Sequence, residues 1–211
     1  GHYFLTLEQA GLPGEGRAFS SVSEAIMAFD AGELGIGAKC RIRFTDILPP
    51  AGVELRADGS ILLETTLGRA LFNEALPADY PYVNVEVGKK KLGQIVNDLA
   101  EQYPKVAVAT TLDKLKDLGF KWATRSGVTV SISDVQTPPN KPEILASYDA
   151  RAAKITKQYE RGKVTEEERH QELLQLWTDA TAELTAAMEA NFTKDNPIFM
   201  MVHSGARGNM T

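Results

Sequence analysis

The segment SGARGN at 204–209 has the residue types best suited to chemistry in this 211-residue sequence. Glycine can adopt positive φ and carries no Cβ, so the backbone around two such residues can turn tightly and point N–H groups at an anion. The arginine between them would add a fixed positive fork. The segment therefore predicts a phosphate contact at Arg207, within a turn made by Gly205 and Gly208. The alternative is an ordinary turn, which is what most short G-x-x-G stretches form.

Charged residues also cluster in the stretch RGKVTEEER at 161–169. Thr165 and Glu168 form a T-x-x-E capping box, so a helix should begin at about Thr165. The charged side chains beside this helix start predict a docking surface for a protein partner, and the alternative is a solvated helical face. The residues concerned are Arg161, Lys163, Glu166, Glu167, Glu168 and Arg169.

Patterns of known catalytic and metal sites are missing from the sequence. The histidines His2, His170 and His203 are far apart, and neither H-E-x-x-H, C-x-x-C nor a P-loop occurs. No G-x-S-x-G elbow and no D-x-D-x-D loop are present. We therefore expect no catalytic residue and no metal site in this chain, and we expect His170 on a helix surface.

Three further basic positions have two interpretations each. Arg69 and Arg125 lie next to or near glycine at element boundaries, where each could pair with an acidic neighbour or contact a ligand. Lys89, Lys90 and Lys91 open a helix at the end that disfavours cations. This run fits either a solvated surface or an anionic neighbour.

The composition bounds the class of protein. A hydrophobic content of 43% can bury a core, and a net charge of −5 argues against a surface that grips duplex DNA. The single Cys40 excludes an intrachain disulfide, fits a reducing cytoplasm and is expected to be buried in a strand. No apolar run is long enough to span a membrane, and we expect a soluble chain without a secretion signal. The sequence starts GHYFLT without methionine, so both ends look cut.

Hydrophobic periodicity predicts a small mixed region followed by long helices. Strands are expected in AKCRIRFTDI (38–47), ILLETT (61–66) and VTVSISDV (128–135). Helices are expected in SEAIMAFDAGEL (23–34), GRALFNEAL (68–76), KKKLGQIVNDLAEQY (89–103) and KVAVATTLDKLKDLGF (105–120), with Gly119 marking or following a helix end. The stretch QTPPNKP at 136–142 reads as a linker.

The remainder reads as an antiparallel helical hairpin closed at Gly162. Residues 141–191 contain seven Lys/Arg and ten Asp/Glu, a net charge of −3, and arms of this length would extend roughly 30 Å at 1.5 Å per residue. Apolar residues recur at steps of three and four along each arm, which predicts a narrow seam. The first arm contributes Ile144, Tyr148, Ala152, Ile155 and Tyr159, and the second Leu173, Trp177, Ala180, Leu184 and Ala187.

The predicted fold class is therefore α+β, with a long coiled-coil hairpin after a small mixed domain. We expect an α+β domain at 1–135, a linker at 136–142, the hairpin at 143–193 and a terminal loop segment at 194–211.

Several long segments resemble the β′ subunit of bacterial RNA polymerase, most of all its actinobacterial form. They are GHYFLT, SSVSEAIMAFDAGEL, TTLGRALFNEALP, GFKWATRSGVTVSISDV, RGKVTEEERHQELLQLW and IFMMVHSGARGN, in this order. The resemblance implies an internal piece of a DNA-directed RNA polymerase, a nucleotidyltransferase. It implies the pore and funnel around the secondary channel, through which nucleotides reach the reaction centre. The magnesium loop of that family, N-A-D-F-D-G-D, has no counterpart here, so the isolated chain is expected to be inactive.

The resemblance also assigns roles and partners. The hairpin corresponds to the rim helices on which Gre-type factors dock. Residues 204–209 correspond to the start of the F-loop, with Arg207 at a position proposed to touch the nucleotide triphosphate. The resemblance implies that Ser204, Gly205, Gly208 and Asn209 support this loop. Implied partners are the rest of β′, the β, α and ω subunits and nucleoside triphosphates. Mg²⁺ and a structural Zn²⁺ are expected elsewhere in the parent subunit, and the implied location is the bacterial cytoplasm, at the nucleoid. Asp117 stands where some relatives have a tyrosine that helps bind an alarmone, so that site is not transferred.

Two alternatives of other classes remain at this point. A free-standing coiled-coil adaptor would use the hairpin to hold a protein partner. An independent nucleotide-binding enzyme would bind nucleotide by itself, which one arginine without metal is not expected to achieve.

Overall fold

The chain folds into two compact units. In the computed structural model, residues 1–45, 47–50, 52–53 and 55–209 are described. The first unit is Gly1–Val128 together with His203–Ala206, and the second is Thr129–Val202 together with the residues from Arg207 onward.

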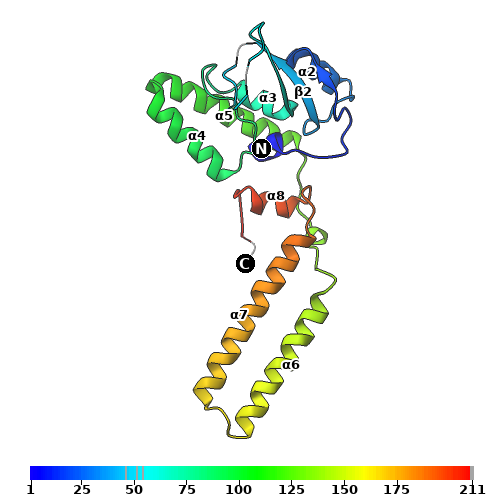
Figure 1. Ribbon diagram of the computed structural model, residues 1–211, viewed down its shortest axis with the longest axis vertical. Helices are drawn as coiled ribbons and strands as arrows, with labels where there is room; N and C mark the ends of the chain where they lie inside the picture. The colour runs from blue at the N-terminus through cyan, green and yellow to red at the C-terminus, as the bar shows by residue number, and fades with distance from the viewer. Residues whose placement is uncertain (46, 51, 54, 210–211) are drawn as a thin grey trace. The chain divides into compact units, whose positions relative to one another are not determined.

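A three-stranded sheet lies in the first unit (Figure 1). The order of its strands is β1-β2-β3. The strands are β1 (Ala18–Phe19), β2 (Lys39–Phe44) and β3 (Ile61–Thr66). β1 is parallel to β2, and β2 is antiparallel to β3 with Lys39 opposite Thr66. Cys40, Ile42 and Phe44 face the core while their neighbours face outward, as the alternating sequence predicts. The two longer strands are thus confirmed, and the two-residue β1 was not predicted.

Among the described residues of the first unit, five helices pack around or beside this sheet. They are α1 (His2–Thr6), α2 (Val22–Asp30), α3 (Leu67–Asn73), α4 (Lys89–Gln102) and α5 (Lys105–Arg125). The hydroxyls of Ser21 and Thr66 cap α2 and α3 by accepting from the N–H groups of Glu24 and Arg69, each at 3.2 Å. Four of these helices were predicted. The short α1 was missed because five residues are too few for a periodic signal.

One apolar core holds the first unit together. Phe72, Leu5, Ile42 and Leu67 are among its fully buried side chains, and Ile95 and Leu99 bring α4 onto it. Cys40 is buried in β2 as predicted. Burial raises the pKa of its thiol to about 11, so the group is neutral and unreactive near neutral pH.

Gly119 lies inside α5, so the prediction of a helix end there is wrong. A Cβ at this position would lie 2.8 Å from the His2 ring, and one on Gly68 in α3 would lie 1.8 Å from the Leu5 carbonyl oxygen. Both glycines therefore allow α1 to pack closely against a longer helix. Sequence alone could not separate this use of glycine from a helix stop.

The predicted strand at 128–135 is also wrong. Within the described part of the chain these residues join no sheet, and Ile132–Asp134 form a short 3₁₀ helix, η1. The Ser131 N–H donates to the Asp134 carboxylate at 2.6 Å, closing a local capping box. Serine and aspartate side chains compete with strand pairing in this way, so alternation was insufficient.

The second unit is dominated by two antiparallel helices, α6 (Lys141–Glu160) and α7 (Glu166–Asn191), which form a hairpin (Figure 1). α6 begins inside the predicted linker, because Pro142 stands in its first turn, where proline is tolerated. The helical hairpin closed at Gly162 is confirmed.

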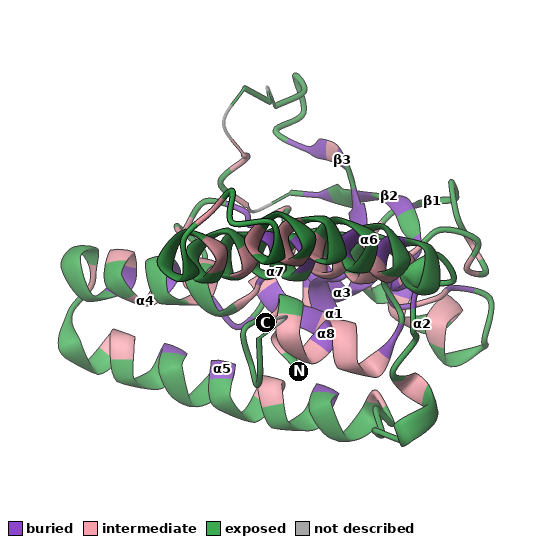
Figure 2. Ribbon diagram, turned by 90° about the horizontal axis from the view of Figure 1, so that it is seen from below, coloured by how far each residue is buried: buried purple, intermediate pink, exposed green. Residues whose placement is uncertain are grey.

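The seam of the hairpin differs from the prediction at two positions, because neither Tyr159 nor Trp177 belongs to the hydrophobic cluster between the arms. Ile144 and Tyr148 of α6 are buried against Leu176 and Ala180 of α7, while Trp177 is 40% exposed. Most of the other residues of α6 and α7 are exposed (Figure 2). A step of three from Leu173 leads to Leu176, whereas the predicted step of four led to Trp177.

A last helix, α8 (Pro197–His203), was not predicted from its apolar sequence. Asn196 caps it, because its Oδ1 accepts from the N–H groups of Ile198 and Phe199 at 2.9 and 3.1 Å. The Asn196 amide also donates to the Asp134 carbonyl at 2.9 Å. This one side chain therefore joins η1 to the start of α8.

Across the described residues, no helix is both long enough and apolar enough to cross a membrane.

Candidate functional site

The terminal loop has the glycine geometry that its sequence predicted. Gly205 and Gly208 adopt φ values of 74° and 76°, a region that only glycine enters without strain. Ser204 supports the turn, because its hydroxyl accepts from the Ala206 N–H at 3.4 Å. The phosphate contact itself remains a prediction.

Lys89 lies against this loop, a neighbour that sequence reasoning did not assign to it. The Lys89 N–H donates to the Ser204 carbonyl at 2.8 Å, and a Cβ on Gly205 would lie 3.1 Å from the Lys89 Cβ. The Ser204 carbonyl thus satisfies the first free N–H of α4, whose N-cap Gly88 has no side chain to do so. Lys89, the first residue of the lysine run, therefore lies beside Ser204 and Gly205. The signal in the sequence that could have indicated this contact was the placement of cations at the helix end that disfavours them.

Arg207 is exposed, and its backbone N–H donates to the Met201 carbonyl at 3.2 Å. Its guanidinium has no ion-pair or hydrogen-bond partner within the described residues. The main chain is held while the charged group is left available, which suits a contact with an external anion. The exposed Asn209 follows the second glycine.

The tip of the hairpin is held by two complete caps. Gly162 adopts a φ of 67°, and the N–H groups of Gly162 and Lys163 donate to the carbonyls of Tyr159 and Gln158 at 2.8 and 3.0 Å. This is a Schellman motif at the end of α6. At the start of α7, Thr165 and Glu168 form the predicted capping box, which is confirmed.

The six predicted docking residues divide into two groups. Glu166 accepts from Tyr159 Oη at 3.1 Å and from Arg169 Nη2 at 3.0 Å, and the Arg169 guanidinium stacks 4.6 Å from the Tyr159 ring. Hydrogen bonds from Thr165 lower the pKa of Glu168, which caps the helix. These three charged residues hold the tip together.

Arg161, Lys163 and Glu167 form the second group. Each is exposed, and its charged group has no hydrogen-bond or ion-pair partner in the part of the chain that the structure describes. A docking partner would meet these three charges first. The structure thus narrows the predicted docking surface without testing it.

The two arginines with alternative interpretations are both used internally. Arg69 is 7% exposed; its Nε donates to the Thr6 carbonyl at 3.1 Å and its Nη1 to Glu8 at 3.2 Å. Arg125 stacks on the Trp122 ring at 5.5 Å. The interpretation of Arg69 as the partner of an acidic neighbour is confirmed.

The three histidines have different surroundings, and the His203 ring lies 5.8 Å from the Tyr3 ring. His2 Nε2 donates to the Leu115 carbonyl at 2.8 Å, and burial lowers the pKa of its ring, whereas His170 is exposed on α7. Among the described residues, no three His, Cys, Asp or Glu side chains are grouped as metal ligands would be.

Comparison with known proteins gives a consistent result along the whole chain. Residues 1–135 match the model of RNA polymerase Rpb1, domain 3, and residues 152–211 match that of domain 4. The DNA-directed RNA polymerase subunits beta' of Cutibacterium acnes and of a Nocardioides species are each 65% identical over 100% of this chain. The subunit of Streptomyces coelicolor is 58% identical, also over 100%.

The chain spans only 16% of the first two relatives and 17% of the third. The similarity therefore concerns one region of a much longer subunit. Two consecutive domains of one family account for most of the chain, in the order in which that family numbers them. The chain belongs to the RNA polymerase Rpb1 family, and it is similar throughout to the beta' subunits of bacteria.

Proposed function

We propose that this chain is the pore and funnel region of a DNA-directed RNA polymerase β′ subunit, the part that lines the secondary channel. The observation that carries the proposal is the 65% identity to β′ subunits over the whole chain. It favours this function over a free-standing adaptor or an independent nucleotide-binding enzyme. The chain would act within a nucleotidyltransferase, with the rest of β′ and the β, α and ω subunits as partners, in the cytoplasm at the nucleoid.

Within that enzyme, Arg207 would guide the triphosphate of an incoming nucleotide. Its exposed guanidinium and its anchored backbone support this role. The Mg²⁺ that drives the parent reaction, and a structural Zn²⁺, would bind to other parts of the subunit. The contribution of Arg207 would then be electrostatic positioning along the path to the reaction centre.

Nucleotide kinetics test this role in the assembled polymerase. Arg207→Ala is expected to raise the apparent KM for nucleotides more than it lowers the rate at saturation, because the contact serves approach and positioning. Arg207→Lys keeps the charge but loses the planar guanidinium, so its apparent KM should lie between those of the wild type and Arg207→Ala. Unchanged elongation at limiting nucleotide in Arg207→Ala would mean that the arginine has only a structural role.

The hairpin would be the docking arm for Gre-type factors. Supporting observations are the self-contained packing of α6 on α7 and the exposed charges at the tip. Exposed charges at such a contact mainly set the association rate and its dependence on salt.

Glu167→Lys is the sharpest probe of this docking, because Glu167 takes no part in either cap. The variant should change the affinity of the polymerase for a Gre-type factor at low salt, and the change should shrink as salt is added. Glu189→Lys, at the other end of α7, is the matched control and should leave the affinity unchanged. Equal affinities of the wild type and Glu167→Lys at low salt would place the docking surface elsewhere.

A further inference from the structure

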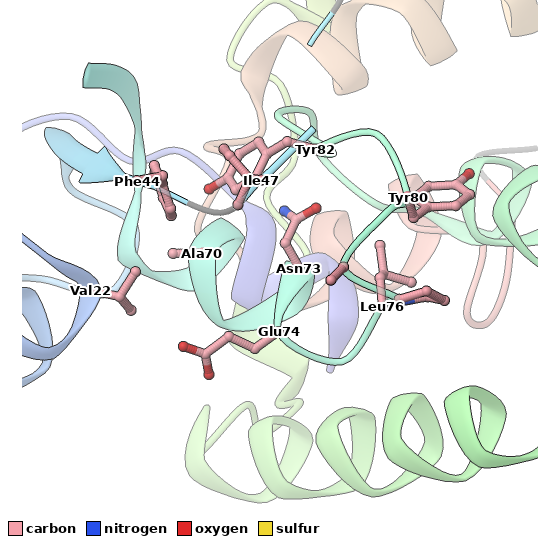
Figure 3. Close-up of a pocket in the computed structure, with 11 residues that line it drawn as sticks. Val22, Phe44, Ile47, Ala70, Asn73, Glu74, Leu76, Tyr80 and Tyr82 are labelled. Atoms are coloured by element: carbon pink, nitrogen blue, oxygen red, sulfur yellow. The ribbon is translucent and has the colours of Figure 1, made fainter. Parts of the chain in front are cut away.

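A cavity of about 240 Å³ opens beside α3 in the first unit. Figure 3 shows α3 across its middle, with Val22 and Phe44 on one side and Tyr80 on the other. We call it the α3 cavity, bounded by Val22, Phe44, Ala70, Glu74, Leu76 and Tyr80. None of its lining residues belongs to the terminal loop or to the hairpin, so neither proposed role explains it.

Most polar groups around the α3 cavity already have partners. The Asn73 amide donates to the carbonyls of Arg69 and Val83 at 2.8 and 2.9 Å, and its oxygen accepts from the Val83 N–H at 2.8 Å. Tyr80 Oη donates to Asp98 at 3.1 Å, and Tyr82 Oη lies 3.1 Å from Thr65 Oγ1. These groups shape the wall and have little capacity left for a ligand.

Glu74 is the exception. Its carboxylate has no hydrogen-bond or ion-pair partner among the described residues, although it lines the cavity. The residue as a whole is exposed, but the protein around its carboxyl group still desolvates the charged form and raises its pKa. A partly desolvated carboxylate without a partner is most strongly satisfied by a cation that donates hydrogen bonds.

The size of the cavity selects between classes of occupant. Pockets for small-molecule ligands usually measure about 300–1,000 Å³, so 240 Å³ is small for a dedicated ligand site. It suits a long side chain whose stem lies against apolar walls while its charged end reaches the rim. Lysine and arginine side chains bury their stems in this way.

We propose that the α3 cavity receives a lysine or arginine side chain from a protein segment outside residues 1–211, with its stem against Phe44 and Leu76 and its cation on Glu74. The occupant is protein because related subunits are about six times as long as this chain, which leaves most of the subunit to surround it. The inference rests on the proposed function, since it places the donor segment within the assembled polymerase.

Carboxyl labelling of the wild-type protein tests the proposal without any variant. Glu74 is expected to react with a carbodiimide and a small amine in the isolated 211-residue chain, and to be protected in the assembled polymerase. With the added amine omitted, a lysine occupant should form an amide cross-link to Glu74, which mass spectrometry would locate. Equal labelling in the two states, in an enzyme that assembles and synthesises RNA, would overturn this inference and leave the proposed function intact.

A matched variant separates a cationic occupant from an apolar cover. Glu74→Gln keeps the shape and removes the charge, so it should leave the stability of the isolated chain nearly unchanged. In the full subunit it should weaken association with the rest of the enzyme by about tenfold, as expected for loss of a charge-assisted contact. Protection of Glu74 in the wild type, with no weakening in Glu74→Gln, would mean an apolar cover and would also overturn the proposal. Failure of the wild-type subunit to assemble would contradict the proposed function instead.

Discussion

Arg69 and Arg207 both stand beside glycine in the sequence, but the structure gives them opposite environments. Arg69, in α3, is buried against the end of α1, where its guanidinium donates to the Thr6 carbonyl and to the Glu8 carboxylate. Arg207 is exposed and only its backbone is bonded. The first arginine therefore stabilises the fold, and the second is free to act on something outside the chain.

Replacing Arg69 should destabilise the first unit strongly. Arg69→Ala removes a buried bond to the Thr6 carbonyl and the ion pair to Glu8, and we expect a loss of about 2–3 kcal/mol in unfolding free energy. Urea denaturation followed by Trp122 fluorescence, in a Trp177→Phe background, would measure it. Arg125→Ala is the control, because an exposed arginine stacked on a ring contributes about 0.5–1 kcal/mol. Losses of equal size in the two variants would contradict the assigned role of Arg69.

The environment of an arginine is hard to predict because its partners are distant in sequence. Glu8 lies 61 residues from Arg69, so nothing local distinguished an internal ion pair from a ligand contact. Lys89 is similar, since its contact with Ser204 joins residues that are far apart in the sequence. By contrast, the capping box of Thr165 and Glu168 was predictable, because all of its atoms lie within four residues.

Among the elements, the hairpin buries Leu176 in its seam where the sequence predicted the next residue, Trp177. Both Leu176 and Trp177 fit an apolar repeat of three and four, and the packing of α6 buries the smaller side chain. Periodicity finds the buried face of a helix to within one residue, and contact with the other helix decides the rest.

Truncating Leu176 and Trp177 one at a time should show which of the two side chains stabilises the hairpin. Leu176→Ala is expected to cost about 2–4 kcal/mol, because it opens a hole in a small core. Trp177→Ala removes a side chain that is 40% exposed and should cost clearly less. Amide hydrogen exchange in peptides from α6 and α7 would report the local stability of the hairpin. A larger loss of stability in Trp177→Ala than in Leu176→Ala would support the predicted seam, with Trp177 in it.

The start of α7 should weaken in acid. The pKa of Glu168 is lowered in the folded hairpin by hydrogen bonds from Thr165, so these bonds stabilise the helix start above the ordinary glutamate pKa of 4.5. That contribution should be lost as the pH falls below 4.5 and through the lowered pKa. Glu168→Gln can keep the capping geometry without the charge, so hydrogen exchange at the start of α7 should lose its acid dependence in this variant. Identical pH profiles would show that Glu168 does not carry the effect.

The strand predicted at 128–135 shows where element prediction fails. Alternation indicates which residues could share a face, but a strand forms only beside another strand. β2 and β3 supply each other with that partner, whereas Ser131 and Asp134 use their side chains to close a local turn. The backbone hydrogen bonds of the hairpin helices are local and need no second strand. Both helices were predicted from the sequence, and this prediction is confirmed.

For the whole molecule, the two hydrophobic clusters have no residue in common. One contains the sheet and α4, and the other lies entirely between α6 and α7. An element with its own core can be altered without disturbing the core of the other unit. This separation supports a division of labour in the proposed enzyme, with one part along the nucleotide path and one arm for regulatory factors.

Removal of the hairpin arm tests this division most directly. Residues 143–191 would be replaced by a short Gly/Ser linker in the full β′ subunit, and RNA synthesis would be measured in the assembled polymerase with and without a Gre-type factor. We predict that factor-independent synthesis is retained while binding of the factor and its stimulation of transcript cleavage are lost. Full factor response without the arm, or loss of factor-independent synthesis from an enzyme that still assembles, would contradict the assignment of the hairpin as a docking arm.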